Sequence, residues 1–239
     1  TATAMMDAAG VVAGSRALDV CTGPGVIASA LAERGAETVG LDFSSEFIAR
    51  AKNNVPSAEF HQGDAQNLPF DDGSFDAVVC GYGIIHVPDP RQALLEIRRV
   101  LKPGGRAAVS VWDALKPTNG FGVVFGAMQA HGNLDVPLPH GPDFFQFSGD
   151  GALVSAIEGV GFKNIEVETV TAVWKIDDPA DVIRALMEAS VRAHGLLTAQ
   201  TDAARAKIDA AIIEGMQQFT SAEGGYVIPM PALIGSGHK

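Results

Sequence analysis

The sequence predicts an α/β fold in which a doubly wound, mostly parallel sheet is covered by helices on both faces. Short strand-like apolar runs alternate with helix-periodic segments through the first half of the chain, and regular elements resume after residue 151. A hydrophobic content of 47% and 27 glycines fit a packed core with many tight turns. We find no internal repeat and no low-complexity linker in the 239 residues, so one domain is expected.

The elements of the first half follow from hydrophobic periodicity and from residues that start or stop helices. Gly35 fits the left-handed position after a helix, Ser44 can cap a helix N-terminus, and Pro90 suits a first helical turn. The strands expected here are 17–20, 38–42, 58–62, 75–80 and 106–112, and the helices are 26–34, 46–53 and 90–100.

The second half is less regular. Residues 116–149 are rich in Gly, Pro and Phe and break the alternation, which predicts a cap of helices and loops. After this cap we expect a helix over 152–160, a strand over 165–173 and amphipathic helices over 181–195 and 202–219. Residues 226–230 are expected to form the last strand, which its prolines restrict to an edge or an irregular position.

Charge and cysteine content narrow the function classes. A net charge of −11 and a pI near 4.9 argue against nucleic acid, because binding phosphates requires a basic surface. No apolar run approaches the roughly 18–20 residues of a membrane helix, and no signal peptide is visible. Two cysteines, Cys21 and Cys80, are too few for a disulfide framework or a zinc site. We therefore expect a cytoplasmic protein with no metal and no membrane partner, whose natural start is missing because the chain begins with Thr.

The turn after the first strand, DVCTGPG from Asp19 to Gly25, indicates a ligand site. Glycine has no Cβ and lets a ligand approach the backbone, and the helix that follows offers free amide donors. Gly23, Gly25 and Ala28 also satisfy the dinucleotide pattern G-x-G-x-x-A. The turn alone is therefore also compatible with a nicotinamide or flavin enzyme, and with a turn that requires glycine only for its backbone conformation and binds no ligand.

Asp42 ends the second predicted strand, 23 residues after Asp19. This spacing fits an acid that binds the ribose of a nucleoside cofactor, since a carboxylate can accept from both ribose hydroxyls. A ribose is present in dinucleotides too, so Asp42 does not distinguish the cofactors. The alternative role is to cap the helix that starts near Ser44.

A third acid, Asp64, follows the third predicted strand and can accept from the exocyclic amine of adenine. At this point the sequence resembles the class I methyltransferases that act on small molecules, a type 11 group that includes the ubiquinone/menaquinone-biosynthesis enzymes. The resemblance runs through LDVCTGPG, GLDFSSEFIARA, GDAQNLPFDDGSFDAVVCGYGIIHVPDP and RRVLKPGGRAAVSVWD, over roughly the first half of the chain. It implies a Rossmann-like, seven-stranded sheet and S-adenosyl-L-methionine as cofactor, with S-adenosyl-L-homocysteine as product.

The resemblance also implies a domain organisation. A single methyltransferase domain would span 1–239, with a cofactor-binding half over 1–115, a cap insertion over 116–150 and a C-terminal half over 151–239. A helical insertion at about 178–222 would precede the last strand.

For the methionine part of the cofactor, the resemblance implies contacts with the backbone from Cys21 through Thr22 and Gly23 to Gly25. Asp19 would reach the amino group through water. The family usually has glycine where this chain has Cys21, so we expect a local backbone that does not strictly require a positive φ.

For the nucleoside, the resemblance implies that Asp42 holds the ribose hydroxyls while Phe43 lies against adenine. Asp64 would accept from the adenine amine, and Ala65 would offer its backbone amide.

The resemblance places Gly81 and Tyr82 beside the sulfonium, and the candidate general base, His86, follows shortly after. With a reference pKa near 6.5, a histidine can accept a proton at neutral pH. The alternative is that His86 only packs or orients its loop. His131 and His140, in the expected cap, are weaker candidates.

His61, on a predicted strand, is expected to be structural. The chain lacks the Asn/Asp-Pro-Pro-Tyr/Phe signature of many methylases that act on amino groups of nucleic acids and proteins, which favours a small, apolar or aromatic acceptor. Apolar residues of the cap either line the acceptor pocket or form the core of a lid; these are Phe121, Phe125, Met128, Phe144, Phe145 and Phe147. An NAD(P)-dependent oxidoreductase and a non-catalytic cofactor-binding module remain the alternative functions.

Overall fold

The computed structural model describes residues 1–113, 116–138, 141–149 and 151–239. The chain divides into two compact units. The first, which we call the sheet unit, comprises Thr1–Asp113, Gly141–Val170 and Ala232–Lys239, and the second, the helical unit, comprises Ala114–His140 and Thr171–Pro231.

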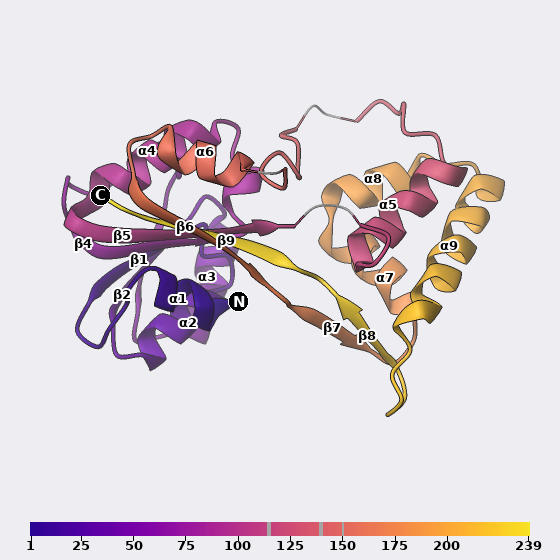
Figure 1. The fold of residues 1–239 in the computed structure, drawn as a ribbon, viewed down its shortest axis with the longest axis horizontal. Coiled ribbons are helices and arrows are strands. Elements are labelled where there is room, and N and C mark those ends of the chain that lie inside the picture. The colour runs from indigo at the N-terminus through magenta and orange to yellow at the C-terminus, as the bar shows by residue number, and fades with distance from the viewer. Residues whose placement is uncertain (114–115, 139–140, 150) are drawn as a thin grey trace. The chain divides into compact units, whose positions relative to one another are not determined.

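The sheet unit is built on a seven-stranded sheet with the order β3-β2-β1-β4-β5-β9-β6 (Figure 1). Neighbouring strands from β3 to β5 are parallel, whereas β9 is antiparallel to both β5 and β6. The predicted doubly wound, mostly parallel sheet is confirmed. Its strands are β1 (Arg16–Val20), β2 (Glu37–Asp42), β3 (Glu59–Gln62), β4 (Phe75–Gly81), β5 (Leu101–Trp112), β6 (Lys163–Val170) and β9 (Ala232–His238).

Helices cover both faces of this sheet. Along β1, Leu18 and Val20 belong to the buried cluster that includes residues of α4 and α6, whereas Ala17 belongs to the cluster with α1 and α2. Alternate residues of a strand face opposite sides, so Asp19 lies on the side of α2. The helices are α1 (Ala2–Ala8), α2 (Val26–Glu33), α3 (Ser45–Asn54), α4 (Pro90–Val100) and α6 (Ala152–Glu158).

The predicted helix boundaries have the expected local causes. Ser44 Oγ accepts from the Phe47 amide at 3.3 Å at the start of α3, and Asp89 accepts from Gln92 at 3.0 Å where α4 begins at Pro90. Gly35 follows α2 with φ +82°, in the left-handed region that glycine reaches without steric cost.

The last strand of the sheet is β9, not 226–230 as predicted from the sequence. The sequence does not indicate β9 as a strand, because Gly235 and Gly237 lower its strand propensity. Both are required by close packing: a Cβ on Gly235 would lie 2.6 Å from Ile157 Cδ1, and one on Gly237 would lie 2.9 Å from Phe162 Cβ. The helix α6 can therefore approach β9 only over glycines.

Residues predicted as one strand over 165–173 divide between β6 and β7 (Val173–Ile176), which belong to different sheets. In the helical unit, β7 pairs antiparallel with β8 (Tyr226–Pro229). The helix predicted over 181–195 is also divided, because Ser190 leaves the helical conformation and its Oγ accepts from Ala193 at 3.2 Å. The helices here are α5 (Gly120–His131), α7 (Ala180–Ala189), α8 (Val191–Thr198), α9 (Asp202–Met216) and the 3₁₀ turn η2 (Gln217–Phe219).

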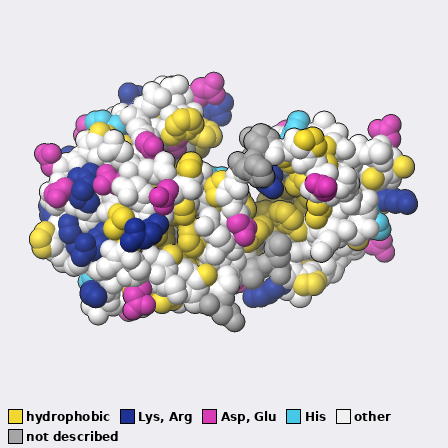
Figure 2. All heavy atoms as spheres, turned by 90° about the horizontal axis from the view of Figure 1, so that it is seen from above, with side chains coloured by type: hydrophobic (Ala, Val, Ile, Leu, Met, Phe, Trp, Pro, Cys, Tyr) yellow, Lys and Arg dark blue, Asp and Glu magenta, His cyan; other side chains and the backbone are white. Residues whose placement is uncertain are grey.

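The units are not divided at the limits of the predicted cap, 116–150. Residues 116–138 group with the helical unit, whereas 141–149 group with the sheet unit. Among the helices that the structure describes, none combines the length and apolar character needed to cross a bilayer. On the face seen in Figure 2, basic and acidic side chains of the sheet unit are intermingled.

Candidate functional site

The residues predicted to bind a cofactor lie in or directly after the strands β1 to β4. Because these strands are parallel, their carboxyl ends meet at one edge of the sheet. After β1 the chain winds toward β2 and β3, whereas β4, on the other side of β1, leads on to β5. Ligands of open α/β sheets bind at such a switch point, outside the carboxyl ends of the strands.

The turn after β1 is fixed by backbone hydrogen bonds. The Thr22 amide donates to Leu41 O at 2.9 Å, and Gly25 donates to Thr22 O at 3.0 Å. Both Gly23 (φ +54°) and Gly25 (φ +89°) are left-handed. A Cβ on Gly23 would meet no atom within 4 Å, whereas one on Gly25 would lie 3.3 Å from Ala51 Cβ. Gly23 thus borders open space, and Gly25 allows the turn to pack on α3.

Cys21 departs from its expected conformation. Its φ is +57°, so the prediction that this position does not require a positive φ was wrong. A left-handed conformation costs a residue with a Cβ roughly 1–2 kcal/mol relative to the right-handed one. The hydrogen bonds of the turn after β1 hold the backbone there despite that cost.

Asp19 is buried at the base of the turn, with 1% of its surface exposed. Its Oδ2 accepts from the Thr22 hydroxyl at 2.6 Å, whereas Oδ1 is buried and accepts no hydrogen bond. Burial raises the pKa of Asp19 to about 7. The Thr22 hydroxyl and the nearby Ala28 amide act in the opposite direction and lower this pKa, although the amide does not form a hydrogen bond with Oδ1. An unsatisfied carboxyl oxygen of this kind suits a ligand that brings a donor or a positive charge.

Asp42 joins the glycine turn to the end of β2. Its Oδ2 accepts from the Gly23 amide at 2.8 Å, and its Oδ1 accepts from the Ser44 amide at 2.9 Å. The carboxylate therefore also supports the start of α3, the alternative role considered above. The next residue, Phe43, exposes 82% of its surface, so its ring is accessible to a ligand.

Asp64 follows β3 and is exposed, whereas Ala65 beside it is buried. Gln66 contacts Asp64 twice: its backbone amide lies 2.9 Å from Oδ1, and its Nε2 lies 3.1 Å from each carboxylate oxygen. Sequence reasoning did not single out Gln66, and no feature of the motif distinguishes it from an ordinary loop residue.

Gly81 ends β4, and Tyr82 follows it directly. A Cβ on Gly81 would lie 2.1 Å from Ile27 Cδ1, so α2 packs directly over this position. Tyr82 has φ +58°, and its ring stacks on Trp112 at 4.1 Å. Its amide contacts Ser110, at 3.0 Å to the carbonyl and 3.2 Å to Oγ.

His86 ends the 3₁₀ turn η1 (Ile84–His86) that follows β4. Its ring meets Phe144 edge-on, with centroids 5.1 Å apart. The side chain keeps contact with solvent, yet partial desolvation lowers its pKa below 6.5. A histidine in this state is neutral at physiological pH and can accept a proton.

The other histidines lie elsewhere. His61 pairs with Glu59 at 2.7 Å and meets the Phe70 ring, which agrees with a structural role. His131 ends α5 in the helical unit, and His140 lies outside the described residues.

The apolar residues named in the predicted cap do not gather in one unit. Phe144, Phe145 and Phe147 belong to the sheet unit, where Phe147 is buried in the core. The remaining three, Phe121, Phe125 and Met128, belong to the helical unit. An apolar hollow of that unit lined partly by Phe121 has a volume of ≈ 20 Å³, about enough for one water molecule.

Comparison with known proteins agrees with this geometry. Residues 18–109 match a family model described as a methyltransferase domain. A demethylmenaquinone methyltransferase of Renibacterium salmoninarum is 43% identical over 106 residues, which cover 44% of this chain and 45% of that protein. The chain thus spans about half the length of several curated relatives it matches. A demethylmenaquinone methyltransferase of Staphylococcus carnosus is 35% identical over 175 residues, covering 66% of this chain and 72% of that protein.

Solved structures share the fold. The YcgJ protein of Bacillus subtilis has a TM-score of 0.64 at 20% identity, over 100% of this chain and 97% of that one. A phosphoethanolamine N-methyltransferase of Haemonchus contortus, solved with S-adenosylhomocysteine, has a TM-score of 0.57 at 20% identity, over 99% of this chain and 52% of that one. With its glycine turn and strand-end acids, the chain belongs to the S-adenosylmethionine-dependent methyltransferases, in the group that includes the demethylmenaquinone methyltransferases.

Proposed function

We propose that this protein transfers a methyl group from S-adenosylmethionine to a small acceptor. One observation carries the proposal: three strands, β1, β2 and β3, end beside Asp19, Asp42 and Asp64, next to a turn whose Gly23 borders open space. Three acids at this spacing match three hydrogen-bond donors of the cofactor, which are its amino group, its ribose hydroxyls and its adenine amine.

The described residues fit this cofactor. Asp19 Oδ1 is buried and unsatisfied, which suits the positively charged amino group. Asp42 keeps unused lone pairs on both oxygens for the ribose hydroxyls, because each oxygen accepts one amide. The exposed Phe43 ring offers a flat apolar surface to adenine, and Asp64 an acceptor for its amine.

The reaction places modest demands on the protein. When bound, the cofactor supplies a methyl group already activated by a sulfonium. The residues of the site must orient the acceptor, exclude water and, for an acidic acceptor, remove a proton. The stacked rings of Tyr82, directly after β4, and Trp112, the last residue of β5, offer an aromatic surface to the acceptor. His86 is the group we assign to accept the proton.

The sheet order argues against the dinucleotide alternative. The six-stranded dinucleotide fold has the parallel order 3-2-1-4-5-6. Here the antiparallel β9 lies between β5 and β6, and Asp64 adds a third acid that a pyrophosphate-linked cofactor does not require. Both features favour a methyl donor.

Thermal-shift and calorimetric titrations with S-adenosylhomocysteine, NADH and FAD test the cofactor. We expect stabilisation by S-adenosylhomocysteine alone, and stabilisation by NADH alone would overturn the proposal. Incubation with methyl-labelled cofactor and a metabolite extract then distinguishes an enzyme, which labels a small molecule, from a non-catalytic module, which binds the cofactor and labels nothing.

A further inference from the structure

The side chain of Gln66 connects the proposed adenine site to the start of α4. Its Nε2 lies 3.1 Å from both Oδ1 and Oδ2 of Asp64, and its Oε1 accepts from the Asp89 amide at 2.9 Å. The orientation of the side-chain amide follows from these partners. A backbone N–H can only donate, so the oxygen must face Asp89 and the NH₂ group must face Asp64.

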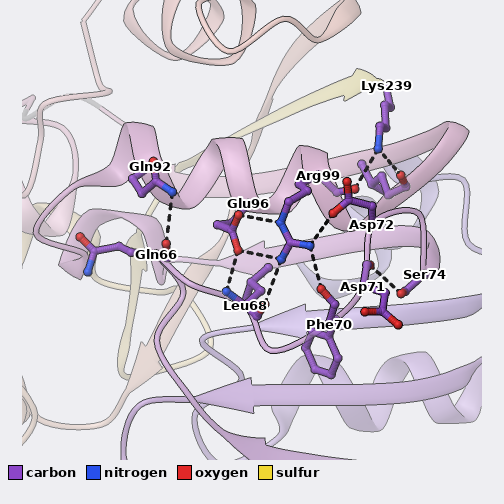
Figure 3. A network of polar contacts seen from close by, with 11 residues as sticks. Gln66, Leu68, Phe70, Asp71, Asp72, Ser74, Gln92, Glu96, Arg99 and Lys239 are labelled. Carbon is purple, nitrogen blue, oxygen red and sulfur yellow. Dashed lines mark hydrogen bonds and ion pairs between the residues drawn. The ribbon is translucent and has the colours of Figure 1, made fainter.

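The backbone that carries Gln66 is held by one face of α4 (Figure 3). Gln92 donates to Gln66 O at 3.3 Å, and Glu96 accepts from the Leu68 amide at 2.8 Å. Arg99 donates to Leu68 O at 2.9 Å and is paired with Glu96. These α4 residues are four and three positions apart and therefore share a helix face. The position of Gln66 is thus fixed by α4 and needs no ligand.

The contacts with Gln66 also determine what Asp64 can still bind. Oδ1 accepts from both the backbone amide and the side chain of Gln66, whereas Oδ2 accepts only from the side chain. A carboxylate oxygen has two lone pairs, so Oδ2 keeps one. Oδ2 therefore has an acceptor position left for a further donor.

We propose that Gln66 is a positioning residue that makes the adenine site selective for a 6-amino purine over a 6-oxo purine. The inference rests on the proposed cofactor. Gln66 fixes the Asp64 carboxylate and leaves Oδ2 available as an acceptor. This acceptor can bind the amine of a 6-amino purine, but it faces another acceptor when the purine carries a carbonyl at that position. An unpaired acceptor opposite a carbonyl is costly in a recognition site.

Calorimetry on the full chain with two ligands tests the proposal. S-adenosyl-L-homocysteine carries the 6-amino group, and S-inosyl-L-homocysteine carries a carbonyl there. We expect the wild-type protein to prefer the adenosyl ligand by about 10-fold or more in Kd. Gln66→Glu replaces the donors that face Asp64 by a repelling carboxylate, and should reduce the preference to about 2-fold, mainly by weakening the adenosyl ligand.

Gln92→Ala is the matched control, because it removes one contact to the backbone of Gln66 without touching Asp64, while the Glu96 and Arg99 contacts remain; the preference should stay well above that of Gln66→Glu. Gln66→Met is a second variant in case Gln66→Glu does not fold. It removes the donors without adding charge, and we expect it to lower the preference too. A wild-type preference near one, or a preference that both Gln66 variants leave intact while the two affinities fall together, would overturn the proposal. Absence of any binding of S-adenosylhomocysteine to the wild type would instead overturn the proposed function.

Discussion

Asp42 Oδ2 accepts a hydrogen bond from the backbone amide of Gly23 at 2.8 Å. Asp42 ends β2 and Gly23 lies in the turn after the neighbouring parallel strand β1, so one carboxylate links the ribose position to the turn that would hold the methionine part of the cofactor. Together with the bond from Ser44 to Oδ1, this contact fixes the carboxylate before any ligand arrives. The site is therefore preorganised, which reduces the ordering that binding must drive.

Asp42→Ala should both destabilise the fold and abolish binding of S-adenosylhomocysteine. Removal of the carboxylate leaves two backbone amides without their acceptor, which costs about 1–3 kcal/mol in the free energy of unfolding. It also removes the acceptor proposed for the ribose. Chemical denaturation and calorimetry measure the two effects separately.

Ser44→Ala provides the control for Asp42→Ala. It removes the N-cap of α3 and should cost about 1 kcal/mol of stability, while its amide still donates to Asp42. We expect binding to survive in this variant. Loss of binding in both variants would show that stability of the turn, and not the carboxylate, governs affinity.

Asp19 should make the unfolding free energy of the ligand-free protein fall as the pH rises from about 4 to 7. Its pKa is raised from 3.8 to about 7 in the fold, so in this range the folded state retains a proton that the unfolded chain releases. The associated stability is present below pH 4 and is lost as the pH passes through 7. The rise in the pKa of Asp19 from 3.8 to about 7 corresponds to roughly 4 kcal/mol in the free energy of unfolding.

Asp19→Asn should remove this pH dependence and make the protein more stable than the wild type at pH 8. Asp76→Asn is a control of opposite sign, because hydrogen bonds from Lys102 and from the Arg16 amide lower the pKa of Asp76; its contribution is lost as the pH falls. If Asp19 faces the amino group, S-adenosylhomocysteine binding near pH 6 must release a proton. Calorimetry in buffers of different ionisation enthalpy measures this proton release, and the absence of any release would contradict the assignment.

Cys21→Gly should be more stable than Cys21→Ala, the reverse of the usual order at an ordinary backbone position. The left-handed φ of +57° favours glycine by about 1 kcal/mol. The two variants both remove the sulfur, so their difference isolates the backbone effect. Equal stability, or a more stable alanine variant, would show that Cys21 carries no conformational strain.

Gly83 gives an independent test at the same place. A Cβ on Gly83 would lie 2.3 Å from Cys21 Cβ, so Gly83→Ala should cost about 1–3 kcal/mol. The cost should be smaller in the Cys21→Gly background, where that contact is absent. A double-mutant cycle measures the coupling, and additive effects would contradict the packing described here.

The sequence was most informative where one local rule determines an element. Helix α4 was predicted with its observed bounds, because Pro90 and the sequence after Val100 mark its ends. The strand β9 was missed, since Gly235 and Gly237 are present for contacts with α6 that only the folded chain shows. In the same way, the break between α7 and α8 at Ser190 lies within a continuous helical periodicity of apolar residues, so the periodicity could not reveal it.

The candidate site shows the same division. The strand-end acids were predictable because motif spacing and strand order place them together. The left-handed Cys21 was not, because its conformation is imposed by hydrogen bonds from Thr22 and Gly25 rather than by its own residue type. Gln66 was not predictable either, since its role depends on where α4 packs.

His86→Gln should lower kcat by about 100-fold or more with an acceptor that must lose a proton, and leave the KM for S-adenosylmethionine nearly unchanged. Because partial desolvation lowers the pKa of His86 below 6.5, the wild-type rate should fall only as the pH drops through a value under 6.5. The acceptor found by methyl labelling serves as substrate, and the pH profile of kcat is the decisive measurement.

His86→Phe separates a proton acceptor from a packing residue. A phenyl ring can keep the edge-on contact that His86 makes with Phe144 at 5.1 Å, but it cannot accept a proton. A base at this position predicts that both variants lose rate and that the acidic limb of the profile disappears in each. Full activity of His86→Phe, together with a lower melting temperature only for His86→Gln, would assign His86 to packing, because the contact and not the proton would then be what the reaction needs.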